Sequence, residues 1–585
     1  MKTTINYAIE RTKLLCCFFF LINNTLFAQS LDWVNGIHGL GIEESTGLAI
    51  DNNGNVYSTG YFSGTINFEA NGTSISITEV ASGYQTYLQK IDALGNIIWV
   101  KTFEATGSSK IFDIHVDDLG NVYLTGGYSG TVDFDPGVGV VNKTALGLLD
   151  SFVAKLDASG NLIWVKTMDG VSSSYGAGFA IEVDAAYNVY ITGTFTLTVD
   201  FDPGPGSFPL TTLVNKAAIY IQKLDAAGNL VWVKTMEGGN FSQSTSRAIA
   251  IDANGNVYTT GDFSGTVDFD PNSGYYPLTG GGIYIQKLDP NGNMLWTKRI
   301  PKGEGFSIAL DVDANVYTNG YFNGLVDFDP GVGTYYLAGS VVAGTQGAGQ
   351  PDNAYIHKLD TDGDFVWAKK ITAFTSVAKG ITLDMNGNVY STGTFSDTAD
   401  LDPNGGVFNL IADNTEDSYV QVLDKNGNFV WATNIGDNHA VSCNDIAIDG
   451  MGKIHLAGSF KGTADFDPSA GINTLTAFGL PGTSIQLDLF VLKLDASSFL
   501  TIEDLEEEFL KGQVYPNPST GTVTIELGQL KNVSIRLFTM TGALVYHKEN
   551  ITDSIHQLTF DGPKGVYLLE LSLGKNKQTY KLVKK

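Results

Sequence analysis

Pairs of aspartates two residues apart recur along the chain, and their spacing suits the binding of a cation. The first pair lies in Val132-Asp133-Phe134-Asp135-Pro136-Gly137. Residues i and i+2 of an extended strand point to the same side, so each pair presents two carboxylates together. Calcium prefers several carboxylate and carbonyl oxygens, so one hypothesis is a calcium site in each repeat. The pairs are Asp133 and Asp135, Asp200 and Asp202, Asp268 and Asp270, Asp327 and Asp329, Asp400 and Asp402, and Asp465 and Asp467.

A second hypothesis gives the same aspartates a structural role. The first Asp would meet neighbouring lysines, and the second would cap the Asp-Pro turn through backbone hydrogen bonds. The segments lack the acid density of dedicated D-x-D-x-D-G calcium loops, which favours this role. The first copy, Asn67/Glu69, departs from the pattern, and the acidic run 360–364 stands where other repeats have a plain hairpin turn. We therefore predict a turn at 360–364.

The remaining reactive residue types form no recognisable catalytic arrangement. The seven histidines are scattered, and the sequence contains no nucleophile elbow, phosphate loop or zinc-helix motif. Cys443 is the only cysteine outside the N-terminal segment that holds Cys16 and Cys17, so we expect no intramolecular disulfide. His439 lies four residues before Cys443 without a third metal ligand, and we interpret both as structural.

The elements that must position these residues repeat every 64 to 71 residues. All seven tryptophans fall at this interval, six of them in phrases such as GNIIWVK and GNLVWVK. A fixed period in this range indicates a repeat architecture. We interpret the tryptophans as packing anchors between neighbouring repeats rather than as sugar platforms, because they lie mid-strand in apolar phrases. They are Trp33, Trp99, Trp164, Trp232, Trp296, Trp367 and Trp431.

Each repeat is predicted to contain four short strands. An alternating run such as GLAID (47–51) precedes a Gly/Asn turn, a second strand such as GNVYSTGYF (54–62), a third such as YLQKID (87–92) and then the tryptophan strand. Alternating β-branched and aromatic residues bounded by D-x-x-G-N turns predict antiparallel hairpins. Four strands per unit, repeated in a row, predict an all-β propeller.

The count of strands predicts seven blades and the way the ring closes. The first three strands occur seven times, but the last set ends at 493–495 without a tryptophan strand. The missing strand is available at 31–35, so we predict that this N-terminal strand completes blade seven. The expected domains are a signal peptide (1–28), a seven-bladed propeller (29–498), an acidic linker (499–513) and a small β-sandwich (514–585).

Charge is distributed unevenly along the chain. The net charge is −27, with about +2 on residues 1–28, −4 on 499–513 and +4 on 514–585, which leaves about −29 on 29–498. Such a surface repels phosphate backbones, so we expect no nucleic-acid partner.

The N-terminal segment resembles a secretory signal. Lys2, Arg11 and Lys13 precede an apolar stretch at 14–22, and cleavage between Ala28 and Gln29 is expected. The stretch is too short to span a bilayer, and no later segment is long and apolar enough, so we expect no transmembrane segment.

The C-terminal segment contains short alternating strands that predict a small immunoglobulin-like sandwich. The phrase Tyr515-Pro516-Asn517-Pro518, the following Gly521, the internal M-T-G-x-x-V, the K-G-x-Y near the end and the basic last strand resemble the type A C-terminal sorting domain of the type IX secretion system of Bacteroidota. The resemblance implies export by that machinery to the cell exterior or outer-membrane surface. It also implies removal of the domain near 500–515, often with transfer of the protein to surface lipopolysaccharide.

Residues 31–498 resemble the SBBP family of bacterial β-propeller repeats through the phrases D-x-x-G-N-V-Y-x-T-G and K-L-D-x-x-G-N-x-x-W. That family implies the fold and no particular activity. We expect a non-catalytic protein that binds an extracellular glycan or protein, with long connections such as 337–353 and 468–487 as contact regions. The alternative is a propeller hydrolase or lyase acting on extracellular polysaccharide, which a cluster of acids, His or Tyr at one mouth of the channel would favour.

Overall fold

The chain forms two compact units, one within Ala28–Ala496 and a second that includes Ser497–Lys585. The computed structural model describes residues 30–585, except for 80–82, 213–215, 239–243, 341–350, 413–415, 437–438, 470, 479–486, 496–513, 528–530, 532, 541–542 and 574–575. The expected signal cleavage at Ala28 and Gln29, and the expected linker 499–513, lie outside these residues. All regular elements in the described residues are β-strands, which confirms the all-β expectation. No helix of this part of the chain is long and apolar enough to cross a membrane.

Within the described residues of the first unit, one antiparallel arrangement of four strands occurs seven times. We number these sheets 1 to 7 in the order of their innermost strands. The innermost strands are β2 (Glu43–Ile50), β9 (Ser109–Val116), β15 (Tyr175–Val183), β21 (Ser244–Ile251), β27 (Glu304–Leu310), β33 (Ser376–Leu383) and β39 (Val441–Ile448). The second strands are β3 (Val56–Phe62), β10 (Val122–Tyr128), β16 (Val189–Thr196), β22 (Val257–Phe263), β28 (Val316–Phe322), β34 (Val389–Phe395) and β40 (Ile454–Phe460).

The outer half of each sheet contains the lysine-bearing and tryptophan-bearing phrases. The third strands are β6 (Gln85–Ile91), β13 (Asp150–Leu156), β19 (Ala217–Leu224), β25 (Gly282–Leu288), β31 (Asn353–Leu359), β37 (Asp417–Leu423) and β43 (Asp488–Asp495). The fourth strands are β7 (Ile97–Lys101), β14 (Leu162–Gly170), β20 (Leu230–Gly238), β26 (Met294–Ile300), β32 (Phe365–Lys370), β38 (Phe429–Ile435) and, for sheet 7, β1 (Ser30–Gly39).

The D-x-x-G-N turns set these hairpins. In sheet 1 the Asp51 carboxylate accepts hydrogen bonds from the backbone N–H groups of Asn53 and Asn55, both at 2.9 Å. Gly54 between them has φ +75°, a conformation that glycine adopts without steric cost. The next strand therefore starts at a fixed position and returns beside the first.

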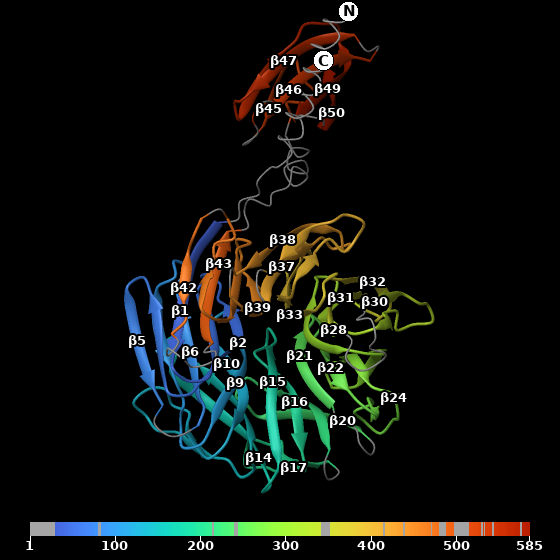
Figure 1. Ribbon diagram of the computed structural model, residues 1–585. Helices are drawn as coiled ribbons and strands as arrows, with labels where there is room; N and C mark the ends of the chain where they lie inside the picture. Colours follow the sequence, from blue (N-terminus) through green and yellow to red (C-terminus); the bar gives the residue numbers. More distant parts are fainter. Residues whose placement is uncertain are drawn as a thin grey trace, which may run out of the picture. The chain divides into compact units, whose positions relative to one another are not determined.

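The innermost strands form a closed ring, which Figure 1 shows as strands around a common centre. Each of them contacts the next one in the chain, and β39 contacts β2. Strand β1 pairs with β43 in antiparallel register, with Trp33 opposite Lys493 and Ile37 opposite Leu489. The N-terminal strand β1 is therefore the fourth strand of sheet 7.

The tryptophans pack between neighbouring sheets. In sheet 1, Trp99 lies edge-on to Tyr57, with ring centroids 6.0 Å apart. The Trp33 indole N–H of sheet 7 donates to the Ala93 carbonyl of sheet 1 at 3.3 Å, and its ring lies against Gly95, where a side chain would clash. The predicted packing role is confirmed, and Trp33 links the last sheet to the first.

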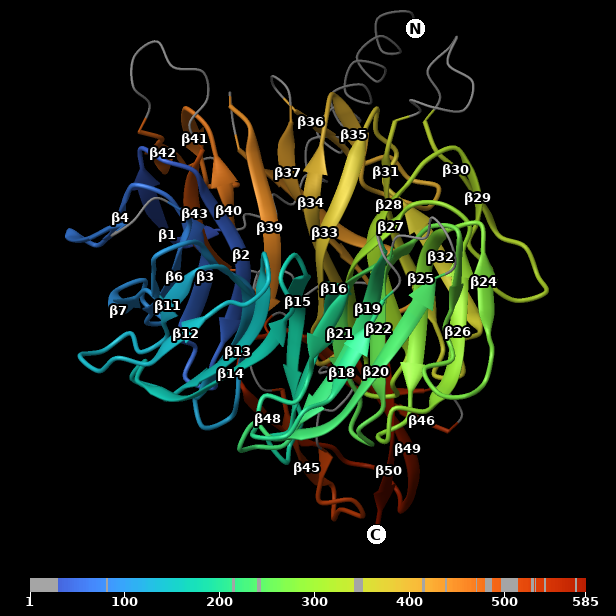
Figure 2. The ribbon, with the colours of Figure 1, turned by 90° about the horizontal axis from the view of Figure 1, so that it is seen from below.

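Each connection between second and third strands contains a small hairpin at the outside of the ring, which Figure 2 shows from another side. These hairpins are β4 (Thr65–Ala70) with β5 (Thr73–Thr78), β11 (Thr131–Asp133) with β12 (Asn142–Thr144), β17 (Thr198–Asp200) with β18 (Pro209–Thr211), β23 (Thr266–Asp268) with β24 (Pro277–Thr279), β29 (Leu325–Asp327) with β30 (Tyr336–Ala338), β35 (Thr398–Asp400) with β36 (Asn409–Ile411) and β41 (Thr463–Asp465) with β42 (Thr474–Thr476).

Several of these hairpins pair with the preceding sheet rather than with their own. Strand β17 of sheet 3 pairs with β14 of sheet 2, β23 of sheet 4 pairs with β20 of sheet 3, and β4 of sheet 1 pairs with β1 of sheet 7. Strand β11 pairs with β8 (Glu104–Ala105), which follows sheet 1. The hairpins thus cover open sheet edges and connect neighbours.

The second unit contains two antiparallel sheets in its described residues. One contains β44 (Val514–Tyr515), β45 (Thr522–Glu526) and β48 (Ile555–Thr559). The other has the order β47 (Leu544–Ile551), β46 (Val533–Thr539), β49 (Gly565–Leu573) and β50 (Asn576–Lys584). Val523, Ile525, Ile535, Leu537 and Leu569 are fully buried in a core shared by both sheets.

Candidate functional site

Every innermost strand of the ring has a β-bulge at the same place. In sheet 1, Ser45 pairs with Gly60 and Gly47 pairs with Thr59, so Thr46 between them has no partner in the ladder. The same shift occurs in the other six described innermost strands. A bulge redirects its extra residue and is typical of positions near functional sites. The bulged residues are Thr46, Phe112, Phe179, Arg247, Phe306, Lys379 and Asn444.

These bulged residues line a cavity of about 400 Å³ at the centre of the ring. Glu44, Ser45, Thr245 and Val377, from the same strands, complete its wall. All seven innermost strands contribute, so the cavity exists only when the ring is closed. We call it the central cavity. Its volume lies at the small end of the usual range for ligand pockets, about 300–1,000 Å³.

The seven repeats carry chemically different side chains at the bulge but similar apolar side chains two residues later. Two residues after the bulge, the seven strands place Leu48, Ile114, Ile181, Ile249, Ile308, Ile381 and Ile446, all of them buried. At the bulge itself, the same strands place three phenylalanines, an arginine, a lysine, a threonine and an asparagine. A purely structural position in a repeat has no need of such variety, so this ring is the strongest candidate for ligand contact.

One side of the central cavity is aromatic. The rings of Phe112 and Phe179 lie 5.3 Å apart between centroids, on the adjacent sheets 2 and 3. On sheets 4 and 5, the Arg247 guanidinium lies 4.9 Å from the centre of the Phe306 ring. These faces offer flat apolar surfaces to a ligand.

Arg247 is neutralised by two carboxylates of the protein. Its Nε lies 3.0 Å from Asp262 and its Nη2 lies 2.7 Å from Glu304. Burial raises the pKa of Asp262; the arginine opposes this shift, and Glu304 adds to it. The guanidinium is therefore held in place, with its charge already compensated.

Lys379 is the other cation of the central cavity. Its ammonium donates to Ser442 Oγ at 2.7 Å and to Asn444 Oδ1 at 2.9 Å, both on sheet 7. None of the ion pairs among the described residues includes it. Burial lowers the pKa of Lys379, with Glu416 and Glu44 acting in the opposite direction. Two of its three donors are used by these neutral oxygens, so one donor is left for a ligand, and among the described residues no carboxylate lies within ion-pair distance.

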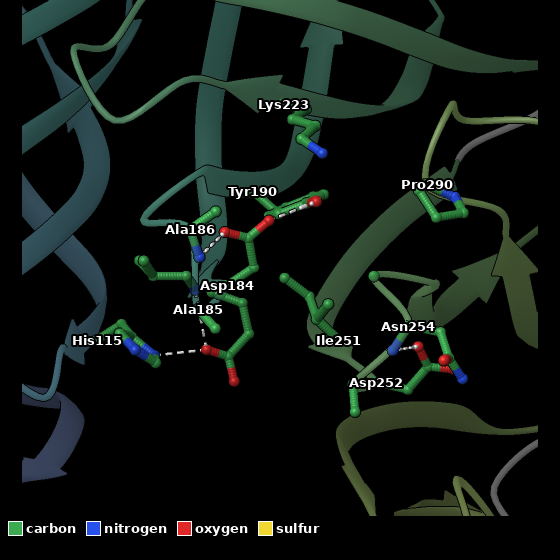
Figure 3. A pocket seen from close by; sticks show the side chains of 14 residues that line it. His115, Asp184, Ala185, Ala186, Tyr190, Lys223, Ile251, Asp252, Asn254 and Pro290 are labelled. Carbon is green, nitrogen blue, oxygen red and sulfur yellow. Dashed lines mark hydrogen bonds and ion pairs between the residues drawn. The ribbon is translucent and has the colours of Figure 1, made fainter.

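A second cavity of about 500 Å³ is lined by residues of sheets 3 and 4 and by His115 of sheet 2 (Figure 3). His115 Nδ1 lies 2.5 Å from Glu182 Oε2, and this carboxylate raises the pKa of His115 against the effect of burial. Asp184 accepts from Ala186 N–H at 2.9 Å and from Tyr190 O–H at 3.0 Å. Asp184 thus performs the same turn-capping role as Asp51 in sheet 1, so this cavity is lined largely by scaffold groups.

The structure places the predicted aspartate pairs in the outer hairpins, far apart in the sequence and each in its own hairpin. Asp133 Oδ1 accepts from the N–H groups of Asp135 and Val141, at 3.1 and 2.8 Å. Asp135 Oδ1 accepts from the Gly137 N–H at 2.8 Å.

The other five pairs repeat these hydrogen bonds. Each first aspartate accepts from the N–H groups two and eight residues further on, as Asp133 does; these are Asp200, Asp268, Asp327, Asp400 and Asp465. Each second aspartate accepts from the N–H group two residues further on, as Asp135 does; these are Asp202, Asp270, Asp329, Asp402 and Asp467. The second aspartates therefore cap their turns, which is the structural role predicted for them.

The calcium hypothesis meets no preformed cluster of ligands at these pairs. No group of three or more His, Cys, Asp or Glu side chains in the described part of the chain is arranged to hold a metal ion. The physical reason is that each pair lies alone in its hairpin and directs one oxygen of each carboxylate to backbone N–H groups. This holds for Asp135 and equally for its counterparts Asp202, Asp270, Asp329, Asp402 and Asp467. Calcium at the pairs stays a prediction, since the second carboxylate oxygen is not used by these backbone bonds.

The lysine partners expected for the first aspartate of each pair do not occur among the ion pairs of the described residues. Backbone N–H groups take their place, because the tight hairpin brings the main chain closer to the carboxylate than any lysine side chain.

The other predicted positions are also located. Asp360 Oδ1 accepts from the N–H groups of Asp362 and Asp364, so the acidic run 360–364 is a hairpin turn as predicted. Cys443 is buried, whereas His439 is directed to the Thr463 carbonyl at 3.1 Å. Of the two long connections expected to contact a ligand, residues 341–350, 470 and 479–486 lie outside the described residues.

Sequence reasoning missed the central cavity. The bulged residues are single positions inside phrases that otherwise repeat, such as KIFDIHVD and SRAIAID. When the seven repeats are aligned, this one position carries chemically different side chains. That variety was the signal in the sequence that could have pointed to the cavity.

Comparison with known proteins bears first on the second unit. The family model described as the secretion system C-terminal sorting domain matches residues 513–585. The resemblance of this segment to the sorting domain is therefore confirmed. It indicates export by the type IX secretion system and a secreted or outer-membrane surface location.

The chain also has a more distant relative. The chain is 22% identical over 514 residues to an uncharacterized WD repeat-containing protein, L264, of Acanthamoeba polyphaga mimivirus, covering 73% of this chain and 36% of the relative. The chain thus spans about a third of the length of that protein.

Solved structures show only a weak likeness. A protein of unknown function from Bacteroides caccae matches 60% of this chain and 89% of its own length, at 11% identity and a TM-score of 0.28. An ulvan lyase, a polysaccharide lyase, matches 77% of this chain and 98% of its own length, at 12% identity and a TM-score of 0.34.

Proposed function

We propose that the first unit is a seven-bladed β-propeller of the SBBP type that binds an extracellular glycan in its central cavity without converting it. The second unit is then an immunoglobulin-like sorting domain of the type IX system. The observation that carries the proposal is the ring of bulged residues, which differ from sheet to sheet while their neighbours repeat. The WD-repeat name of the mimivirus relative agrees with a repeat propeller.

The composition of the cavity wall fits a sugar better than a protein surface. Sugars combine flat C–H faces, which pack on aromatic rings, with hydroxyl groups that need directed hydrogen-bond partners. Phe112, Phe179 and Phe306 supply the faces, and the remaining donor of Lys379 supplies a polar group. A concave site of about 400 Å³ admits the end of a chain or one short unit, whereas a folded protein needs a broader surface.

The test is a glycan array with the full-length chain, followed by calorimetry on the glycans that bind. The double variant Phe112→Ala/Phe179→Ala should weaken binding at least about tenfold. Phe208→Ala, a change to an exposed ring on an outer hairpin, is the matched control and should leave binding unchanged. Equal binding by wild type and the double variant would place the glycan elsewhere, and an array without binding would reject the proposal.

A propeller lyase or hydrolase is the second candidate, and one observation favours it. Lys379 is half-buried in the central cavity with a pKa lowered by burial, which is the state required of a lysine acting as a general base. Release of reducing or unsaturated ends from a polysaccharide panel, lost in Lys379→Met, would establish catalysis.

After export, we propose that removal of the sorting domain leaves the propeller attached to surface lipopolysaccharide or free outside the cell. Mass spectrometry of the surface form tests this, because a C-terminus near 500–515 with a lipopolysaccharide adduct distinguishes the anchored product from the released one.

A further inference from the structure

We infer that the central cavity binds an acidic sugar, a saccharide unit that carries one carboxylate or sulfate group. Its ring stacks on Phe112 and Phe179, and its anionic group pairs with the Lys379 ammonium. This inference rests on the proposed function, since it specifies which class of glycan the cavity takes.

The closed ring sets the two contacts on opposite sides. Phe112 and Phe179 belong to sheets 2 and 3, and Lys379 belongs to sheet 6. In a ring of seven, sheet 6 faces the boundary between sheets 2 and 3. A sugar lying on the aromatic pair therefore presents its far edge to the lysine.

The two cations of the cavity are not equivalent. Arg247 already pairs with Asp262 at 3.0 Å and with Glu304 at 2.7 Å. Lys379 donates to the neutral oxygens Ser442 Oγ and Asn444 Oδ1 and is in no ion pair of the described residues. Glu416 and Glu44 act on this ammonium without forming an ion pair with it, so its burial is only partly offset, and an anion from a ligand in direct contact would offset it further. Lys379 is thus the cation that remains for the ligand.

The surroundings limit the ligand to a single negative charge. The first unit carries about −29, and Glu44 also lines the cavity. Phosphate chains and nucleic acids need several Arg and Lys side chains around them, which this cavity lacks in its described wall. One lysine opposite an aromatic pair matches one carboxylate or sulfate on an otherwise neutral sugar.

The experiment is calorimetry on the full-length chain with sugars that differ only in the anionic group. The probes are galacturonate against galactose, glucuronate against glucose, and glucose 6-sulfate against glucose. We expect at least one acidic member to bind about tenfold or more tightly than its neutral counterpart, as a charged hydrogen bond provides. The carboxylate and sulfate arms show which group is taken.

Variants separate the lysine from the rest of the site. Lys379→Met should bring the acidic sugar to the affinity of the neutral one. Lys425→Met is the matched control, because Lys425 is exposed at a turn of the same sheet, and it should keep the preference. If Lys379→Met does not fold, added salt provides the second readout on wild type, since it should weaken binding of the acidic sugar and leave galactose unaffected.

The outcomes distinguish this inference from the proposed function. Equal affinity for acidic and neutral sugars, or a preference that survives in Lys379→Met, overturns the acidic sugar and leaves glycan binding in place. Absence of binding to every sugar, on the array as well as in calorimetry, overturns both.

Discussion

A bulged residue has no cross-strand partner, so its side chain can be suited to a ligand without disturbing the ladder. Phe112, Arg247 and Lys379 occupy one backbone position in three sheets, yet their side chains have unrelated chemistry. The isoleucine two residues later fills the space between sheets and is constrained by packing. At the scale of the residue, the ladder thus separates positions that build the ring from positions that face its centre.

Asp113, next to the bulge of sheet 2, predicts a pH-dependent stability. Its carboxylate accepts from the Ile181 N–H of sheet 3 at 2.8 Å, and burial raises its pKa to about 8. Between about pH 4 and pH 8 the unfolded chain loses this proton while the folded chain keeps it, so stability falls as pH rises.

The measurement is the urea midpoint from about pH 5 to pH 8 for wild type and Asp113→Asn. We expect the variant to lose part of the decline, because an amide stays neutral in both states. Asp313→Asn, at an exposed turn, is the control and should keep the wild-type slope. A variant slope as steep as that of wild type would contradict the assignment.

The aspartate pairs give a test of calcium against turn capping. Asp135→Asn keeps an oxygen that accepts from the Gly137 N–H, so capping predicts an unchanged melting temperature, whereas Asp135→Ala should cost about 1 kcal/mol. Calorimetry and thermal melts with millimolar calcium complete the test. A calcium-induced rise in melting temperature that Asp135→Asn abolishes would establish the cation site instead.

At the scale of elements, the ring depends on pairings between strands of different repeats as well as on the hairpins within each sheet. The hairpins β4–β5, β17–β18 and β23–β24 pair with the preceding sheet, and β1 pairs with β43 from the other end of the unit. Through these pairings, backbone hydrogen bonds join neighbouring sheets. Without them, only side-chain packing would hold the sheets together.

Deletion of residues 30–37 should open the ring. It removes the strand that pairs with β43, and with it the buried Trp33 and Ile37. The loss of a large aromatic and a whole strand should lower the melting temperature by roughly 10 °C or more.

The control for that deletion is a peptide of residues 30–39 added in trans. If the strand acts through pairing, the peptide should bind the shortened chain and restore much of the lost stability. An unchanged melting curve after the deletion would reject the closure.

At the scale of the whole molecule, the central cavity and the sorting domain belong to different units. The first unit carries the acidic surface, and the second, which matches the sorting-domain family, carries about +4 over 514–585. The opposite charges belong to units with separate cores, so a change in one should leave the other folded.

Removal of residues 513–585 should stop export at the periplasm, because the matching family marks this segment as the outer-membrane sorting signal. Immunoblots of periplasmic and surface fractions measure this. A reporter enzyme fused to residues 1–28 and 513–585 is the positive control and should reach the outside. Surface display of the truncated chain would contradict the assignment.

The sequence by itself determined the features that depend on residues close together in the chain. Turns such as Asp51 to Asn55 and the tryptophan phrases act within a few residues, so they predicted strands, repeats and the sorting domain. The unmatched strand at 31–35 predicted the pairing with β43, because a missing partner is visible in a count of strands.

Only the tertiary structure decided which polar and aromatic side chains lie together in a cavity. Thr46 and Asn444 are about 400 residues apart in the sequence and share one cavity wall, because closure of the ring brings β2 beside β39. The bulge that directs them inward depends on the register between two strands, which a pattern of alternating residues does not specify. The pairing of β4, β17 and β23 with the preceding sheet is likewise a contact between repeats, so a single repeat does not contain it.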